Sequence, residues 1–251
     1  VRDRGLRWRD IAVLGQQMES YGSILRRVFD EYDIPCFMDE KREITDHPLI
    51  KLLLASLAVI NRGYRYDDLA LLLKSGLSNL NPEESEQIEN YMLAYGIQGK
   101  LCREEFTRGQ TELGSEYLEI LNGYRHSLID PLQKLEKNIR GQKNCRDISR
   151  ALYLYLQSLN VETKLGNWTE ELQRDELYEY ARENAQIWNI VMETFDQMVT
   201  ILGNNEVNLH EYARILEAGY KAFSVGIIPT TVDQVLIGSI KRDRKSTRLN
   251  S

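Results

Sequence analysis

The sequence lacks clustered cysteines, long apolar runs and glycine-rich phosphate loops. Its three cysteines, Cys36, Cys102 and Cys145, are far apart and form no CxxC pair. That scatter disfavours a metal site, which needs clustered ligands, and is typical of free buried thiols in a reducing compartment. No apolar run approaches the roughly 20 residues that a membrane span requires. Neither GxxxxGK(S/T) nor a GxGxxG after the first predicted strand occurs, which excludes a P-loop and disfavours a dinucleotide site.

The composition is that of a folded soluble chain with an acidic balance. Hydrophobic residues make up 42% and charged residues 28% of the 251 residues, which favours one large or two modest packed domains over disorder. The net charge of −6 argues against a nucleic-acid module that acts through bulk charge. It leaves open a local basic groove within a larger assembly.

Both ends of the sequence are unusual. Val1 opens a charged segment without a signal peptide, so we expect the chain to begin within a longer protein. Residues 245–251 resemble translated sequencing-adapter sequence. We expect them to be a non-native tail, and their basic charge is not interpreted as a DNA-binding feature.

The N-terminal region predicts a small parallel sheet. Residues 11–14 and 34–38 are short apolar runs of the kind that form buried strands. Between them, apolar residues recur at the spacing of one helix face: Tyr21, Ile24, Leu25, Val28, Phe29 and Tyr32. Two strands around one helix predict a βαβ unit. A further strand is predicted at 232–237.

The middle of the chain predicts helix after helix. Pro48 is placed to open an apolar helix over 48–60. Asn81 with Glu84, and Asn208 with Glu211, have the spacing of helix N-caps. Pro131 should kink or break a long helix, and 170–202 is the longest predicted helix. The predicted fold class is mainly α with a small α/β part, in which a large α-helical insertion interrupts an incomplete parallel-sheet domain.

No convincing catalytic or metal site is found. The pair His210-Glu211 begins like HExxH, but the fifth residue is Arg214, so a capped helix start is favoured. His47, just before Pro48, is interpreted as structural, and His126 as solvated. The lack of a nucleophile–base set disfavours an independent hydrolase. Tyrosines at helical spacing could stack on bases, but this spacing is more typical of core residues.

Several short motifs carry a family resemblance. Residues 8–14 (WRDIAVL) and 34–39 (IPCFMD), separated by a helix, resemble the start of the second motor domain of UvrD-like superfamily-one helicases. Residues 7–244 as a whole resemble the B subunit of AddAB-type ATP-dependent helicase/deoxyribonucleases. Further matching motifs are 19–21, 39–42, 45–49, 89–91, 93–97 and 232–239.

The resemblance implies a bacterial cytoplasmic complex that resects DNA double-strand ends for repair. It implies DNA and an A subunit as partners, and no membrane. The complete subunit would be an ATP-dependent 3'-5' exodeoxyribonuclease that uses ATP, Mg²⁺ and a 4Fe-4S cluster, with no cofactor in this segment. It further implies that 1–63 and 223–244 form an incomplete helicase-like (RecA-like) domain and that 64–222 form its helical insertion.

The same resemblance singles out four positions. Gln16 stands where active helicases have an arginine that reaches the nucleotide phosphates, and Gly238 replaces a histidine of a later motif. Gly238, Ser239 and Lys241 are the implied DNA contacts. The segment would therefore be a degenerate motor that guides or scaffolds DNA without chemistry of its own. The alternative, which the acidic balance favours for the segment alone, is a protein–protein scaffold that contacts the partner subunit.

Overall fold

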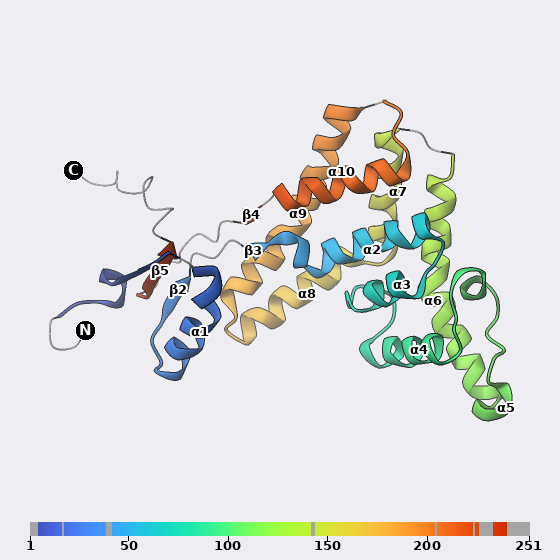
Figure 1. Ribbon diagram of the computed structural model, residues 1–251, viewed down its shortest axis with the longest axis horizontal. Coiled ribbons are helices and arrows are strands. Elements are labelled where there is room, and N and C mark those ends of the chain that lie inside the picture. Colours follow the sequence, from blue (N-terminus) through green and yellow to red (C-terminus); the bar gives the residue numbers. More distant parts are fainter. Residues whose placement is uncertain are drawn as a thin grey trace. The chain divides into compact units, whose positions relative to one another are not determined.

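The computed structural model describes residues 5–16, 18–38, 42–141, 144–203, 205–222, 224–225 and 233–239. Figure 1 shows a mainly helical chain with a small three-stranded parallel sheet, which confirms the predicted fold class. The chain divides into two compact units, Val1–Arg42 with Ser224–Ser251 and Glu43–Phe223. We call them the sheet unit and the helical unit. The assignment of 1–63 and 223–244 to a helicase-like domain and of 64–222 to an insertion stays a prediction.

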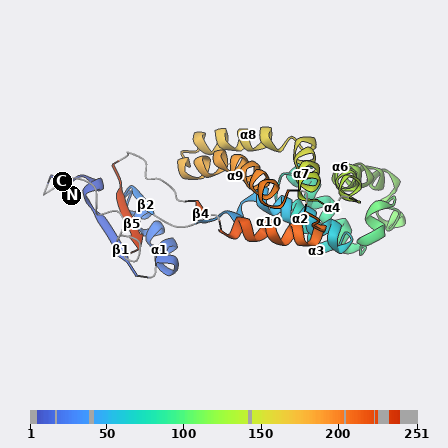
Figure 2. The same ribbon diagram turned by 90° about the horizontal axis from the view of Figure 1, so that it is seen from above.

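Three parallel strands form the sheet. They are β1 (Ala12–Gly15), β2 (Cys36–Met38) and β5 (Val235–Ser239), and α1 (Met18–Glu31) connects β1 to β2. The strand order is β1-β5-β2 (Figure 2), so the expected βαβ unit is parallel but leaves a gap that β5 fills. The third strand begins at Val235 rather than at residue 232, which lies outside the described residues, and it extends beyond residue 237 to Ser239.

A small core joins α1 to one face of this sheet. Val235 and Ile237 are buried at its centre, and Leu25 and Phe29 of α1 pack against them. The predicted apolar face of α1 is wider than the buried one, because Tyr21, Ile24, Val28 and Tyr32 are exposed. A helix across three short strands buries only its central row of side chains.

The remaining elements are short 3-10 helices, a second small sheet and the helices of the helical unit. The 3-10 helices are η2 (Trp8–Asp10), η3 (Ile44–Asp46) and η4 (Gly99–Arg103), and the strands β3 (Arg42–Glu43) and β4 (Ser224–Val225) make a second sheet. The helices of the helical unit are α2 (Pro48–Arg62), α3 (Tyr66–Leu73), α4 (Pro82–Ala94), α5 (Gln110–Leu113), α6 (Ser115–Ile139), α7 (Cys145–Ser158), α8 (Val161–Arg174), α9 (Tyr178–Leu202) and α10 (Leu209–Ala222).

Helix α2 lies at the centre of the helical unit. It packs against α3, α6, α9 and α10, and its buried residues are Leu49, Ile50, Leu52, Leu53, Ala55, Ser56, Leu57 and Val59. Each large apolar side chain buried in this way contributes about 1.5–3 kcal/mol. Five described tyrosines are also buried, namely Tyr64, Tyr91, Tyr155, Tyr212 and Tyr220. The last four lie on helices and serve the core, as their helical spacing predicted.

The local end signals of these helices are confirmed. Pro48 is the first residue of α2, and Asn81 forms a reciprocal capping box with Glu84. The Glu211 backbone N–H donates to Asn208 Oδ1 over 2.9 Å. These helix-start interactions form between residues that are close in sequence, so the sequence alone predicts them.

One helix prediction is wrong, and one of two expected outcomes at Pro131 is excluded. Of the kink or break expected there, the break does not occur: α6 continues to Ile139, with Ile129, Leu132 and Leu135 buried on both sides of the proline. The helix expected over 170–202 is two helices, since α8 ends at Arg174 and the chain reverses through Glu176 at φ 61°. Helices α8 and α9 then pack along each other (Figures 1 and 2).

Candidate nucleic-acid interface

The carboxyl ends of β1 and β5 bring two of the predicted site positions together. Gly15 is aligned with Ser239, so the exposed Gln16 follows β1 at the sheet edge where β5 ends. Ligands of open parallel sheets bind at this edge. The side chain of Ser239 and all of Lys241 lie outside the described residues, so their contacts stay predictions.

Gly238 is not required by the packing around it. A Cβ atom built there would lie 3.8 Å from Leu14 Cδ2, an ordinary van der Waals distance. The glycine therefore serves no tight turn, and its residue is partly exposed. A ligand could approach the main chain closely at this point.

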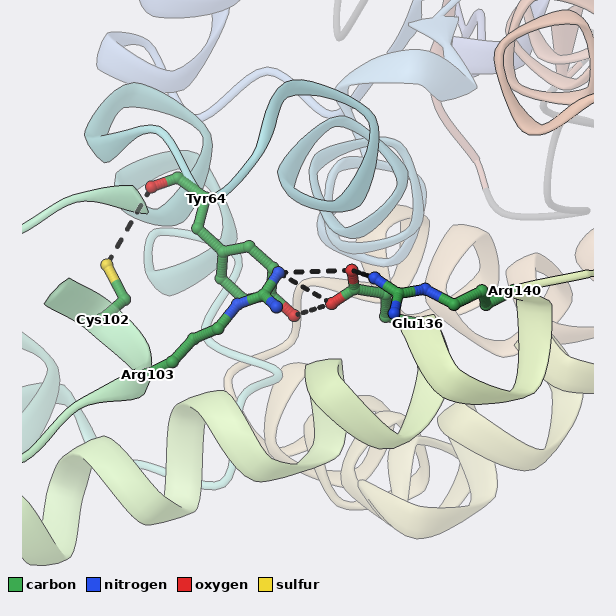
Figure 3. Close-up of polar contacts among 5 residues, drawn as sticks. All are labelled: Tyr64, Cys102, Arg103, Glu136 and Arg140. Carbon is green, nitrogen blue, oxygen red and sulfur yellow. Dashed lines mark hydrogen bonds and ion pairs between the residues drawn. The ribbon is translucent and has the colours of Figure 1, made fainter. Parts of the chain in front are cut away.

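A partly buried carboxylate fixes the end of α6 in the helical unit (Figure 3). Glu136 accepts hydrogen bonds from Tyr64 Oη at 3.0 Å, from Arg103 Nη2 at 2.9 Å and from Arg140 Nη2 at 3.3 Å. Its side chain is only 16% exposed. Three donors from the turn after α2, from η4 and from the end of α6 thus converge on one carboxylate, which satisfies the charge that burial would otherwise penalise.

Tyr64 is the most constrained member of this network. It is fully buried and has a φ of 61°, which is rare for a residue with a side chain. The Arg103 guanidinium lies 4.3 Å from the centre of its ring. Burial, together with Glu136, raises the pKa of the phenol well above its ordinary value, so Tyr64 remains a hydrogen-bond donor. The network is structural, and it positions the end of α6.

A cavity of about 560 Å³ opens beside this network. It is lined by Ile60, Glu136, Ile139, Arg140, Gly141, Glu206, Val207, Asn208, Leu209 and Glu211. Glu136 and Arg140 bind each other, and Glu211 accepts from the Asn208 backbone N–H. Glu206 is a further carboxylate of the lining. Among the described lining residues there is neither a nucleophile nor an acid–base pair for chemistry.

Positive charge is concentrated at the end of α6 and the start of α7 in the helical unit. Residues 134–150, called here the basic hairpin, contain six lysines and arginines against two acids, in a chain whose net charge is −6. Lys134, Lys137, Arg146 and Arg150 are all exposed. Sequence reasoning missed this feature, although a basic residue every three or four positions was its signal.

His47 is structural, as expected. It is 8% exposed, its Nδ1 accepts from the Leu49 backbone N–H at 3.1 Å, and its Nε2 lies 3.2 Å from Asn184 Oδ1. Burial lowers its pKa to about 4, so the ring is neutral and caps α2. His126, expected to be solvated, is exposed and lies beside Asp130.

The described residues show neither a metal cluster nor a membrane helix. Cys102 and Cys145 are buried free thiols and Cys36 is half-buried, and burial raises the pKa of Cys102 to about 11. Within the described ranges, no group of three His, Cys, Asp or Glu side chains is placed to hold a metal ion. No described helix is both long and apolar enough to cross a membrane.

Comparison with known proteins gives long and strong matches. No family model matches the chain. Over 97% of its length, however, the chain is 45% identical to the B subunit of the ATP-dependent helicase/deoxyribonuclease of Alkaliphilus metalliredigens and 46% identical to that of Alkaliphilus oremlandii. The corresponding protein of Clostridium botulinum (strain Loch Maree / Type A3) is 37% identical over 97% of the chain. The chain spans 22% of the length of each of these relatives.

Proposed function

Because the chain is homologous to a segment of the B subunit of ATP-dependent helicase/deoxyribonucleases, we propose that it is the internal helicase-like segment of such a bacterial DNA-repair protein. In this proposal it guides or scaffolds DNA during the processing of double-strand breaks and carries out no chemistry itself. The observation that carries the proposal is the 45% identity over 97% of the chain.

The sheet edge supports the degenerate-motor part of the proposal. Gln16 follows β1 at the edge where β5 ends. A motor needs a positive charge near the transferred phosphoryl group, and a glutamine amide supplies none. We propose that ATP, Mg²⁺ and a 4Fe-4S cluster are bound by other parts of the longer protein and that this protein acts in the cytoplasm.

DNA is proposed to reach the same edge through its backbone. Gly238 permits close approach of the main chain, Ser239 would contribute a hydroxyl group and Lys241 a charge to phosphate oxygens. The A subunit of the complex is the second proposed partner.

A protein–protein scaffold is the alternative function. The net charge of −6 favours it, because a surface that repels DNA can still bind a partner protein. The basic hairpin supports DNA instead, since its positive charge is concentrated on exposed side chains.

Three measurements on the purified chain test the proposal. We expect no phosphate release from ATP with or without DNA, and salt-sensitive binding to a fluorescent single-stranded oligonucleotide. Turnover of ATP would contradict the degenerate motor. Capture of the A subunit without any DNA binding at low salt would instead establish the scaffold function.

A further inference from the structure

The exposed face of α7 carries a row of four side chains that take no part in the core. Arg146, Arg150, Tyr153 and Gln157, called here the α7 stripe, follow one another at i, i+4, i+7 and i+11, which places them on one side of the helix. All four are exposed. The opposite side of α7 is buried through Ile148, Leu152, Tyr155 and Leu156, so the core fixes the direction in which the stripe faces.

The two arginines of the stripe are without partners in the described part of the chain. Arg62 is bonded to Asp68, and Arg103 to Glu136, whereas the structure shows no hydrogen bond or ion pair for Arg146 or Arg150. The adjacent acid does not compensate them, because Asp147 accepts from the Asn144 side-chain amide at 2.7 Å. Their charges are free for a ligand.

The position of Arg146 is also unfavourable for the helix itself. It is the second residue of α7, where the aligned N–H groups already make the helix end positive. Such a site prefers Asp or Glu, and a cation there costs stability. Since no contact within the described fold offsets this cost, the charge indicates a negatively charged partner.

Tyr153 adds an aromatic ring to the stripe. It is 38% exposed, whereas Tyr155, two residues along, is 4% exposed. The Gln157 side-chain amide donates to Tyr153 Oη at 2.8 Å, which restricts the ring to the helix surface. Tyr155 Oη instead accepts from Ser56 of α2 at 3.0 Å. The two tyrosines therefore have different roles, the second in the core and the first at the surface.

We propose that the α7 stripe binds single-stranded DNA, with Arg146 and Arg150 on successive phosphates and Tyr153 stacked on a base. The proposal rests on the proposed function for its ligand class and locates a contact surface in the helical unit, separate from Gly238, Ser239 and Lys241. Guanidinium groups beside an aromatic ring are typical of single-strand binding, in which unstacked bases expose their faces. A duplex offers phosphates but no free base faces, and an acidic peptide offers neither phosphates nor bases. Lys134 and Lys137 of α6 extend the positive surface on the helix that packs against α7.

The test is equilibrium binding of a fluorescent oligothymidylate to the full chain, followed by anisotropy at several salt concentrations. The variant Arg146→Gln/Arg150→Gln should lower the affinity about tenfold, and it should reduce the slope of log affinity against log salt by about 1.4, as expected for two lost single-strand phosphate contacts. The matched control is Arg174→Gln/Arg214→Gln, which removes the same charge from exposed positions of α8 and α10 that have no partner among the described residues. It should bind like the unmodified chain.

Tyrosine variants separate stacking from charge. Tyr153→Leu should weaken binding to the single strand by at least about fivefold and leave binding to the matching duplex unchanged, while Tyr153→Phe keeps the ring and should bind normally. Circular dichroism and the denaturant midpoint verify that each variant is folded.

The outcomes distinguish failure of the α7 stripe from failure of the proposed DNA-guiding function. If the unmodified chain binds the oligonucleotide but the stripe variant matches its control, the α7 stripe is wrong and the proposed function stands. If polyglutamate of equal charge displaces the oligonucleotide from the stripe with equal affinity, the surface binds acidic protein and the inference is overturned. If the unmodified chain fails to bind DNA even at low salt, the DNA-guiding function itself is wrong.

Discussion

His47 and Asn184 join the start of α2 to α9 through a hydrogen bond of 3.2 Å between the imidazole Nε2 and the amide Oδ1. Because Nδ1 of the same ring accepts from the Leu49 backbone N–H, the ring must be neutral, with its proton on Nε2. Asn184 in turn donates to the Leu165 carbonyl at 2.7 Å and to Thr169 Oγ1 at 2.9 Å. One neutral histidine thus connects α2, α8 and α9.

This link predicts a loss of stability in mild acid. The pKa of His47 is about 4 in the folded chain against 6.5 in the unfolded chain, so between these values the unfolded chain binds more protons. The free energy of unfolding that the neutral His47 ring contributes is fully present above pH 6.5 and is lost as the pH decreases toward 4. At about pH 5 the loss should be about 2 kcal/mol.

The control for this prediction is His47→Asn, which keeps an N-cap acceptor but does not titrate. Urea unfolding of both proteins at neutral pH and near pH 5 gives the difference. Equal pH dependence of the two proteins would show that His47 does not titrate as described.

Replacing the shared carboxylate should destabilise the helical unit. Glu136→Leu leaves the buried Tyr64 hydroxyl and the Arg103 guanidinium without their acceptor, at a cost of about 2–3 kcal/mol. Glu136→Gln retains one acceptor and should cost less. Chemical denaturation measures both, and Glu119→Leu, an exposed change on the same helix, should stay within about 0.5 kcal/mol.

A double-mutant cycle isolates the Tyr64 part of this effect. In a Tyr64→Phe background, Glu136→Leu should cost about 1 kcal/mol less than in the unmodified chain, because the hydroxyl that it would leave unpaired is already gone. Strict additivity of the two changes would show that the hydrogen bond contributes nothing.

Pro131 should destabilise α6. It lies in the interior of a helix that continues to Ile139, where proline removes one backbone hydrogen bond and crowds the carbonyl group of the preceding turn. Pro131→Ala should therefore raise the free energy of unfolding by about 1 kcal/mol or more. Thermal and urea unfolding measure the gain, and a destabilised variant would mean that α6 needs the proline.

Lys164 should hold the loop between α3 and α4. Its Nζ donates to the Ser78 carbonyl at 2.7 Å and to the Leu77 carbonyl at 3.2 Å, and burial lowers its pKa. Lys164→Met keeps the apolar stem and removes both bonds, so amide hydrogen exchange should accelerate over residues 76–81. Lys137→Met, at an exposed position of α6, should leave exchange there unchanged.

Local signals in the sequence predicted much of the fold, and signals that depend on distant contacts did not. Pro48, Asn81 and Asn208 mark helix starts through neighbours in sequence. The reversal at 175–177 has neither glycine nor proline to announce it, and the burial of α8 against α9 decides it. For the same reason the break that Pro131 could have caused does not occur, since packing on both sides outweighs its local penalty.

The candidate sites divide in a similar way. The proximity of Gln16 to the end of β5 followed from two strands and a motif, and the register of the sheet places both at one edge. The Glu136 network joins Tyr64, Arg103 and Arg140, and Tyr64 lies 72 residues from Glu136; no spacing rule connects such positions. The residues of the α7 stripe have a recognisable helical spacing in the sequence. The negative net charge of the whole chain drew attention away from these local positive charges.

The place of β5 in the middle of the sheet sets an order of events during synthesis. β1 and β2 are synthesised before β5, yet among the described strands each pairs only with β5, which begins at Val235. At roughly 5–20 residues per second, synthesis of the intervening 200 or so residues takes roughly 10–40 s. During that interval both strands lack their partner β5, and their edges are open to pairing with wrong strands. The three-stranded sheet therefore cannot be completed until β5 has been synthesised, and its exposed strand edges need protection until then.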